Sequence, residues 1–280
     1  MEKLDPNVPP SRAESPGARS SARKGLSPRI AESIAADLRQ RVLRGELGNG
    51  ELPRQEDLLR EYGVSGPSLR EALRILEAEG LITVRRGKFG GAHVHRPDWA
   101  SAAFSVALAM QGQGVRIADL AEALLILEPM CAAECARRKD RHERLVPALR
   151  ENLEKTEKLI GHGAEYSASA REFHDIMVTG VENETLRLIV RTLVSIWSIQ
   201  EQIWAATVNA AHQYPDELAQ RESHRTHVKL LKLIEEGDVE GVQKLAAAHL
   251  RATQAIVLER FGDEVVDSSS LDAVQAFKRL

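Results

Sequence analysis

From Pro97 onwards, apolar residues recur at helical spacing almost without interruption, and this pattern limits the possible fold more than any other feature. Aromatic residues make up only 4% of the sequence, and a composition dominated by Ala, Leu, Glu and Arg favours helices over sheets. We therefore expect residues 98–262 to form an all-helical bundle, followed by a tail at 263–280. The predicted helices span about 117–139, 142–160, 165–179, 184–212, 216–236 and 239–261, with a further short helix from Leu271.

The part before Pro97 has a different organisation. Residues 1–25 are rich in Pro, Ser and Arg and lack apolar periodicity, so we expect a mobile arm that either has no role or touches DNA phosphates. Residues 29–44 carry an apolar residue at every fourth position and predict one helix. Two shorter helices are predicted at 55–62 and 67–79, and two short strands at 81–84 and 92–95.

The break at Gly63-Val64-Ser65 lies between the two shorter helices, and the Gly-rich segment 86–91 lies between the two strands. Three helices followed by a hairpin with a basic tip are typical of a winged helix-turn-helix, whose second helix enters the major groove of DNA. The expected fold is therefore mainly α. It consists of a winged helix-turn-helix with a small β-hairpin wing at 26–97 and a C-terminal all-α helical bundle.

Charge separates the two parts of the chain. Residues 1–100 carry an excess of three positive charges, and residues 101–280 an excess of six negative charges. Basic residues of the first part cluster between Arg19 and Arg29 and again at Arg85, Arg86 and Lys88. This asymmetry indicates that the first part contacts a polyanion and the second does not.

The sequence predicts neither a membrane span nor secretion, because it has no apolar run of about 18 residues and no apolar segment near the N-terminus. Its two cysteines, Cys131 and Cys135, are four residues apart in a predicted helix and cannot form a disulfide framework. They are either small buried residues or a redox or metal pair. A reducing cytoplasm fits this cysteine usage.

Two regions carry a family resemblance. The first, about 65 residues long, resembles the DNA-binding domain of the GntR family of bacterial transcription regulators. Its matching residues are Leu52-Pro53, Leu58, Gly63-Val64-Ser65, Leu69-Arg70-Glu71-Ala72-Leu73, Leu76, Glu79-Gly80-Leu81 and Gly87. The second, over about 115–260, resembles the FCD effector domain of the FadR subfamily. Its matching residues are Leu127-Glu128-Pro129, Phe173-His174, Asn183, the segment 227–238 and His249-Leu250.

The resemblance implies a ligand-responsive regulator that binds a palindromic double-stranded DNA operator as a homodimer. Arg70, one turn into the recognition helix, is our first candidate for contacting the operator. Ser65 and Ser68 either cap that helix or contact a phosphate. The other candidate contacts are Arg54 and the wing residues Arg86, Gly87 and Lys88. Many relatives have a base-reading Arg at the place of Gly66, and the acyl-CoA-responsive branch has another at Glu56, so we expect altered operator bases.

Three histidines point to a metal centre in the bundle. His227 lies ten residues before Gly237 and His249 eleven after Asp238, so a fold-back at this break sets both rings at the same height. His174 shares a helix face with Met177, and imidazoles that converge inside a bundle match zinc or nickel ligation. Metal-dependent FCD domains have a His at each of these positions. Their fourth ligand, an Asp, is Ala170 here, and Glu172 points elsewhere on the helix.

The effector pocket is expected to be apolar, because Leu124 or Leu125 stands where the family frequently has an Arg that meets a carboxylate effector. We expect a small-molecule effector with an apolar part, in a pocket lined by Leu124, Met177, Trp197 and Trp204, although these residues also suit a plain core.

Three other functions remain as alternatives to a metal-binding regulator: an enzyme, a metal-free regulator and an architectural protein without an effector. A metal-dependent enzyme fused to a DNA-binding domain would use an open three-His zinc, but the sequence contains no HExxH, GxSxG or P-loop motif, so we expect no enzyme. A metal-free regulator of the acyl-CoA-responsive kind would use the same fold. An architectural DNA-binding protein would not need the acidic bundle.

Overall fold

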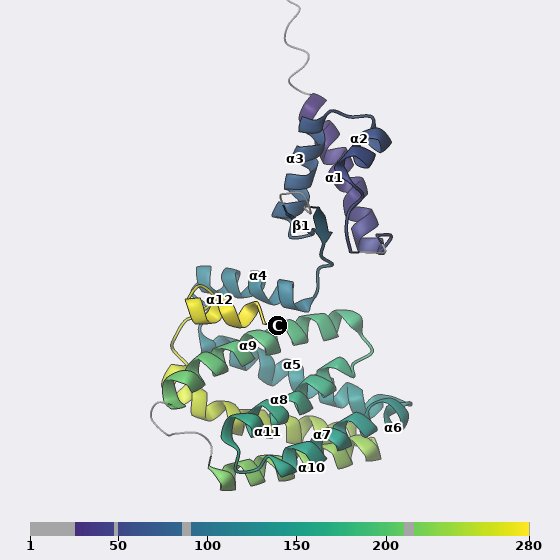
Figure 1. Ribbon diagram of the computed structural model, residues 1–280. Coiled ribbons are helices and arrows are strands. Elements are labelled where there is room, and N and C mark those ends of the chain that lie inside the picture. Colours follow the sequence, from purple (N-terminus) through teal and green to yellow (C-terminus); the bar gives the residue numbers. More distant parts are fainter. Residues whose placement is uncertain (1–25, 48–49, 86–90, 210–215, 280) are drawn as a thin grey trace, which may run out of the picture. The chain divides into compact units, whose positions relative to one another are not determined.

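The computed structural model describes residues 26–47, 50–85, 91–209 and 216–279. The chain divides into two compact units, Met1–Pro97 and Asp98–Leu280 (Figure 1). The predicted fold class is confirmed, since a helix-turn-helix unit with a two-stranded hairpin is followed by an all-helical unit. No helix of the described residues is long and apolar enough to cross a membrane.

The first unit contains three helices and one hairpin. Its elements are α1 (Leu26–Arg44), α2 (Gln55–Tyr62), α3 (Gly66–Ala78), β1 (Ile82–Val84) and β2 (Ala92–Val94). The strands are antiparallel, with Thr83 opposite His93. Leu38, Leu58, Leu69 and Leu76 are fully buried between the helices and hold α3 against α1.

The turn between α2 and α3 depends on Gly63, which ends α2 in the left-handed conformation at φ 62°. A side chain at this position would be strained, which explains the glycine in the predicted break. The backbone is extended again at Ser65, and α3 starts at the next residue with Pro67 in its first turn.

The second unit is a helical bundle (Figure 1). Its elements are α4 (Trp99–Gly112), α5 (Ile117–Arg137), α6 (Arg141–Arg144), α7 (Val146–Lys158), α8 (Gly163–Thr179), α9 (Glu184–Asn209), α10 (Glu217–Glu236), α11 (Val239–Phe261) and α12 (Leu271–Phe277). The region predicted as one helix at 142–160 is instead divided into α6 and α7 at Leu145, because Pro147 starts a new helix in its first turn. Helix α4 was not among the predicted helices.

Two hydrophobic clusters fill this unit. One is formed by α5, α7, α8, α10 and α11 around Phe173 and Leu230. The other is formed mainly by α4, α5 and α9 around Leu124 and Ile196. Helix α5 contributes to both, and its largest contact is with α11, so it is the central helix of the bundle.

The last residues of the chain complete the second cluster. Val266 and Phe277 are buried, and the ring of Phe277 packs edge-on against Phe104 of α4 with 5.4 Å between centroids. Gln111 of α4 accepts hydrogen bonds from the backbone and hydroxyl of Ser268. Residues 266–277 are thus integrated into the fold of the second unit.

Candidate metal centre and nucleic-acid interface

His174 of α8, His227 of α10 and His249 of α11 bring their rings together inside the second unit. The Nε2 atom of His227 lies 3.2 Å from Nε2 of His174 and 2.9 Å from Nε2 of His249. The expected level placement of His227 and His249 is therefore present. It depends on Gly237, which reverses the chain between α10 and α11 at φ 74°.

The contacts of these nitrogens fit a shared cation. An imidazole nitrogen offers one lone pair or one proton in the ring plane, so Nε2 of His227 cannot make a hydrogen bond to both neighbours at once. A single metal ion that accepts a lone pair from each ring satisfies all three nitrogens, and the ligand atoms lie within 4.8 Å of one another. The triad can therefore hold a metal.

Burial keeps two of these rings neutral. His227 is 1% exposed, and desolvation, followed by the proximity of His174 and His249, lowers its pKa well below the ordinary value. Desolvation and His174 lower the pKa of His249 to about 3. Both rings consequently have a free lone pair at neutral pH, which is the form that binds metals.

The ring of His227 is held by stacking on Phe173, with centroids 4.5 Å apart and planes at 6°. Its Nδ1 atom is buried without a hydrogen-bond partner, and so is Nδ1 of His224, one turn earlier on α10. Sequence reasoning did not single out His224, although its i, i−3 spacing from His227 was a signal for it.

A buried carboxylate lies beside the triad. Glu128 of α5 is 6% exposed, and its Oε2 lies 3.2 Å from Nδ1 of His174. The two groups have the separation of an ion pair but are not aligned as a linear hydrogen bond. Sequence reasoning used Glu128 as a family mark without giving it a role in the site.

No carboxylate takes the place of the family's Asp on α8. That position is Ala170, and the carboxylate of Glu172 accepts hydrogen bonds from Lys155 at 2.7 Å and Asn152 at 3.2 Å. The expectation that Glu172 points away from the histidines therefore agrees with its contacts.

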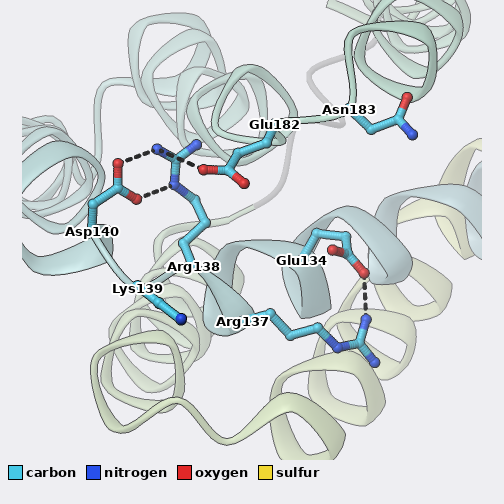
Figure 2. A pocket seen from close by; sticks show the side chains of 7 residues that line it. All are labelled: Glu134, Arg137, Arg138, Lys139, Asp140, Glu182 and Asn183. Atoms are coloured by element: carbon cyan, nitrogen blue, oxygen red, sulfur yellow. Dashed lines mark hydrogen bonds and ion pairs between the residues drawn. The ribbon is translucent and has the colours of Figure 1, made fainter.

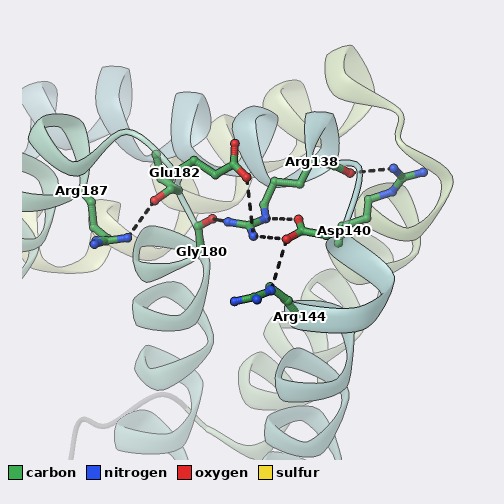
Figure 3. A network of polar contacts seen from close by, with 8 residues as sticks. Arg138, Asp140, Arg144, Gly180, Glu182 and Arg187 are labelled. Carbon is green, nitrogen blue, oxygen red and sulfur yellow. Dashed lines mark hydrogen bonds and ion pairs between the residues drawn. The ribbon is translucent and has the colours of Figure 1, made fainter.

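A polar network around Arg138 joins the ends of α5 and α8 (Figure 3). The Arg138 guanidinium donates two hydrogen bonds of 2.8 Å to the carboxylate of Asp140 and one of 2.6 Å to the carbonyl of Gly180. Its Nη2 also lies 3.8 Å from Glu182. This network ties the C-terminal end of α5 to the C-terminal end of α8; Glu128 and His174 lie further back in these two helices.

A surface cavity of about 320 Å³ surrounds the same arginine (Figure 2). Arg137 is paired with Glu134, and Arg138 with Asp140, so the arginines of this cavity are already neutralised by its own acids. The cavity is therefore a poor anion site, and the histidine triad remains the candidate centre of the second unit.

The expected effector residues do not form one surface. Leu124 and Trp197 belong to the cluster around α4 and α9, whereas Met177 belongs to the cluster that contains Phe173. The side chain of Trp204 lies outside the described residues. Gln254 of α11 is 2% exposed, and neither atom of its amide has a hydrogen-bond partner, which sequence reasoning did not anticipate.

Cys131 and Cys135 are buried and free, and Cys135 donates a hydrogen bond to the carbonyl of Met177. Desolvation raises the pKa of each thiol to about 12. Such thiols are hardly ionised at neutral pH, as expected for small core residues.

In the first unit, Arg70 is exposed on α3, and its Nη1 lies 3.2 Å from where a Cβ at Gly66 would be. Ser65 is exposed at the N-cap of α3, but its side chain makes no cap hydrogen bond. Capping alone therefore does not explain why a serine stands at this position. Ser68 is buried, and Arg54 is exposed at the N-cap of α2. The wing residues Arg86, Gly87 and Lys88 lie outside the described residues.

The chain combines a helix-turn-helix unit, with an exposed Arg on its second helix, and a helical unit with a buried cluster of metal-donor side chains. This combination defines a class of protein. The class is that of DNA-binding regulators with a separate ligand-binding domain. The comparisons with known proteins agree. Residues 30–92 match the family described as bacterial regulatory proteins, gntR family, and residues 119–252 match the FCD domain.

The curated relatives include transcriptional repressors named NanR. The protein from Escherichia coli strain K12 is 24% identical over 242 residues, covering 84% of this chain and 85% of its own. The one from Klebsiella aerogenes is 40% identical over 78 residues, which is 28% of each chain. A solved structure, Streptococcus agalactiae GntR, aligns with a TM-score of 0.58 at 19% identity, covering 81% of this chain and 99% of that one, and supports the fold.

The chain belongs to the GntR family and carries the FCD domain of the FadR-like subfamily. The two matched regions together cover most of its length. The family is one of transcription regulators and not of enzymes, so the interpretation as a metal-dependent enzyme is not supported.

Proposed function

We propose that this protein is a cytoplasmic transcriptional repressor that binds a palindromic operator as a homodimer and changes its DNA affinity when a small molecule binds the FCD domain. The observation that carries this proposal is the buried triad of His174, His227 and His249 in a chain that also has a helix-turn-helix unit. The repressor sign is supported by the NanR relatives, which are named repressors.

Operator contacts are assigned to the exposed start of α3. Arg70 has the length and charge to make a bidentate contact with guanine or to bind a phosphate, and the exposed Ser65 hydroxyl, which makes no cap hydrogen bond, is placed to meet a phosphate. Arg54 and the wing residues Arg86, Gly87 and Lys88 supply further backbone contacts. Ser68 is buried, so we assign it a supporting place beside Ser65, whose hydroxyl lies 3.4 Å away.

The bound metal is zinc or nickel. Three imidazoles would hold it through Nε2, and this donor set leaves coordination positions open. The metal would supply a fixed positive charge in the interior of the bundle, to which an anionic group of the effector can bind. Because Ala170 provides no carboxylate, the charge is neutralised less than with four ligands, and affinity for the metal is reduced.

The effector combines an apolar part with at least one polar group. Met177, which shares a cluster with Phe173, is assigned to its apolar lining, whereas Leu124 and Trp197 belong to the other cluster. The unpartnered amide of Gln254 offers a donor group and an acceptor inside the bundle. A buried amide without partners is costly, and a bound polar group would remove that cost.

The test uses the full chain and a DNA fragment from upstream of its own gene. Footprinting is expected to protect two half-sites related by two-fold symmetry. Binding is then compared for chelator-treated, zinc-loaded and nickel-loaded protein, and a thermal-shift screen of metabolites with and without chelator identifies the effector. A single unrepeated half-site contradicts the dimer, and a melting temperature that no metal changes contradicts the metal centre.

A further inference from the structure

The charge of the proposed metal centre is not balanced by its ligands. The three ligands are histidines, and two of them are held neutral by burial. A divalent cation bound by neutral imidazoles would leave two positive charges in the interior, which is unfavourable without a compensating anion. The usual source of that anion on α8 is absent, because the position is Ala170.

We propose that Glu128 is the positioning residue of this metal centre: its carboxylate keeps the proton of His174 on Nδ1, directs the Nε2 lone pair at the metal, and supplies the missing negative charge. The inference depends on the metal binding proposed above. It assigns Glu128 a place beside a ligand, not a place on the metal.

The tautomer follows from the contact between Glu128 and His174. Oε2 of Glu128 lies 3.2 Å from Nδ1 of His174. If Nδ1 carried a lone pair, two electron-rich atoms would face each other in a buried site, so the proton is favoured on Nδ1. Nε2 then carries the lone pair, and this atom is the one that faces His227 at 3.2 Å.

Glu128 is free for this role. Among the described residues, no Lys or Arg side chain forms an ion pair with Glu128, and His174 is its single ionic contact. The other acids discussed above are already paired: Glu172 with Lys155, Glu134 with Arg137 and Asp140 with Arg138.

The backbone holds the pair in register. Glu128 lies in α5, which ends at Arg137 and has Arg138 as its C-cap residue. His174 lies in α8, whose C-cap residue is Gly180. The hydrogen bond from Arg138 to the Gly180 carbonyl ties these two helix ends together (Figure 3). Removing a carboxylate that orients a ligating histidine typically weakens metal affinity 10- to 100-fold.

The experiment measures Co²⁺ and Zn²⁺ affinity of the full chain after chelator treatment, for wild type, Glu128→Ala and Glu128→Gln. Glu128→Ala is expected to weaken binding about 10- to 100-fold. Glu128→Gln is expected to lose less, because its amide oxygen keeps an electron-rich atom beside Nδ1 while the charge is gone. Glu134→Ala, on the same helix, is the control and is expected to bind as wild type does.

A second variant separates charge from folding. In Glu128→Ala combined with Ala170→Asp, a carboxylate returns at the family position, and we expect affinity to recover. A purely structural loss at Glu128 would not be rescued from another helix. Melting temperatures in chelator, followed by tryptophan fluorescence, are expected to agree within a few degrees between wild type and Glu128→Gln.

Each outcome is distinct. If wild type takes up no metal, the proposed metal centre is wrong and this inference falls with it. If wild type binds metal and Glu128→Ala binds it equally well, the inference alone is wrong. If the Co²⁺ absorption of metal-saturated Glu128→Gln shows a changed coordination number, Glu128 is a direct ligand and the positioning role is overturned.

Discussion

The Nε2 atoms of His227 and His249 lie 2.9 Å apart, although the two residues are 22 positions apart in the chain. Helices α10 and α11 reverse at Gly237, and the two residues lie almost equally far from the reversal. Since each added helical residue turns a side chain by about 100°, the two rings meet only for one length of the intervening chain. The spacing between them is thus as much part of the site as the rings.

Replacing His227 by Ala is expected to abolish binding of one divalent ion per chain. Its Nε2 lies next to Nε2 of both other histidines, so its loss leaves only two of the three imidazole ligands. Metal is measured by mass spectrometry of protein purified without chelator. His162→Ala, at an exposed histidine, should keep the metal content of wild type. Retention of metal by the His227 variant would contradict the proposed centre.

Stability of the metal-free second unit is expected to fall as the pH drops below about 6.5. The folded state holds His227 and His249 with lowered pKa values, so the unfolded chain binds more protons in this range. Each such histidine contributes a slope of about 1.4 kcal/mol per pH unit. The stabilisation is complete above the unfolded pKa and is lost progressively towards pH 3 for His249.

Urea unfolding in chelator at pH 7.5, 6.5 and 5.5 measures this dependence. All three tryptophans, Trp99, Trp197 and Trp204, lie in the second unit, so their fluorescence reports on it alone. The double variant His227→Gln and His249→Gln should have a smaller slope over the same range. Equal slopes for the two proteins would show that these rings titrate normally in the folded state.

Arg70→Ala is expected to weaken operator binding by about 1–3 kcal/mol per half-site, because it removes a side chain placed to contact bases or phosphates. Fluorescence anisotropy with labelled operator gives the affinity, and sedimentation checks that assembly is unchanged. The matched control is Arg221→Ala, which removes the same charge from an exposed site of the second unit. Wild-type affinity of the Arg70 variant would place the recognition helix elsewhere.

Gln254→Leu is expected to leave the free energy of unfolding unchanged or raise it by about 1 kcal/mol, because the buried amide has no partner to lose. The same variant should lose sensitivity to the effector once one is identified. Gln254→Ala controls for volume and should be destabilised by the cavity it leaves. A loss of stability in Gln254→Leu as large as in Gln254→Ala would mean that the amide is hydrogen-bonded.

Arg138→Ala is expected to lower the free energy of unfolding of the second unit by about 2 kcal/mol, because charge-assisted hydrogen bonds to Asp140 and the Gly180 carbonyl are lost. Arg137→Ala, which removes an exposed ion pair with Glu134, should cost less than about 1 kcal/mol. Denaturant melts of both variants decide the question. Equal destabilisation would mean that the network does not join α5 to α8.

The sequence predicts the parts that local spacing determines and misses those that depend on packing between distant segments. Gly63 and Gly237 end helices by backbone conformation, so both turns were found. Helix α4 was not proposed, because its run of Ala and other apolar residues has little periodicity.

The same distinction applies within the candidate site. The spacing around Gly237 places two histidines together, whereas the contact of Glu128 with His174 requires the packing of α5 on α8. Met177 and Leu124 both lie on apolar faces, but each face belongs to a different cluster, which no single-helix pattern reveals.

The packing of Phe277 against Phe104 also affects when the protein can fold during synthesis. Helix α4 is made soon after the DNA-binding unit, yet its partner α12 is made only after helices α5 to α11. Contacts of such long sequence separation form late, whereas the helix-turn-helix is complete within the first hundred residues. A nascent chain can therefore carry a folded DNA-binding unit before the second unit has closed.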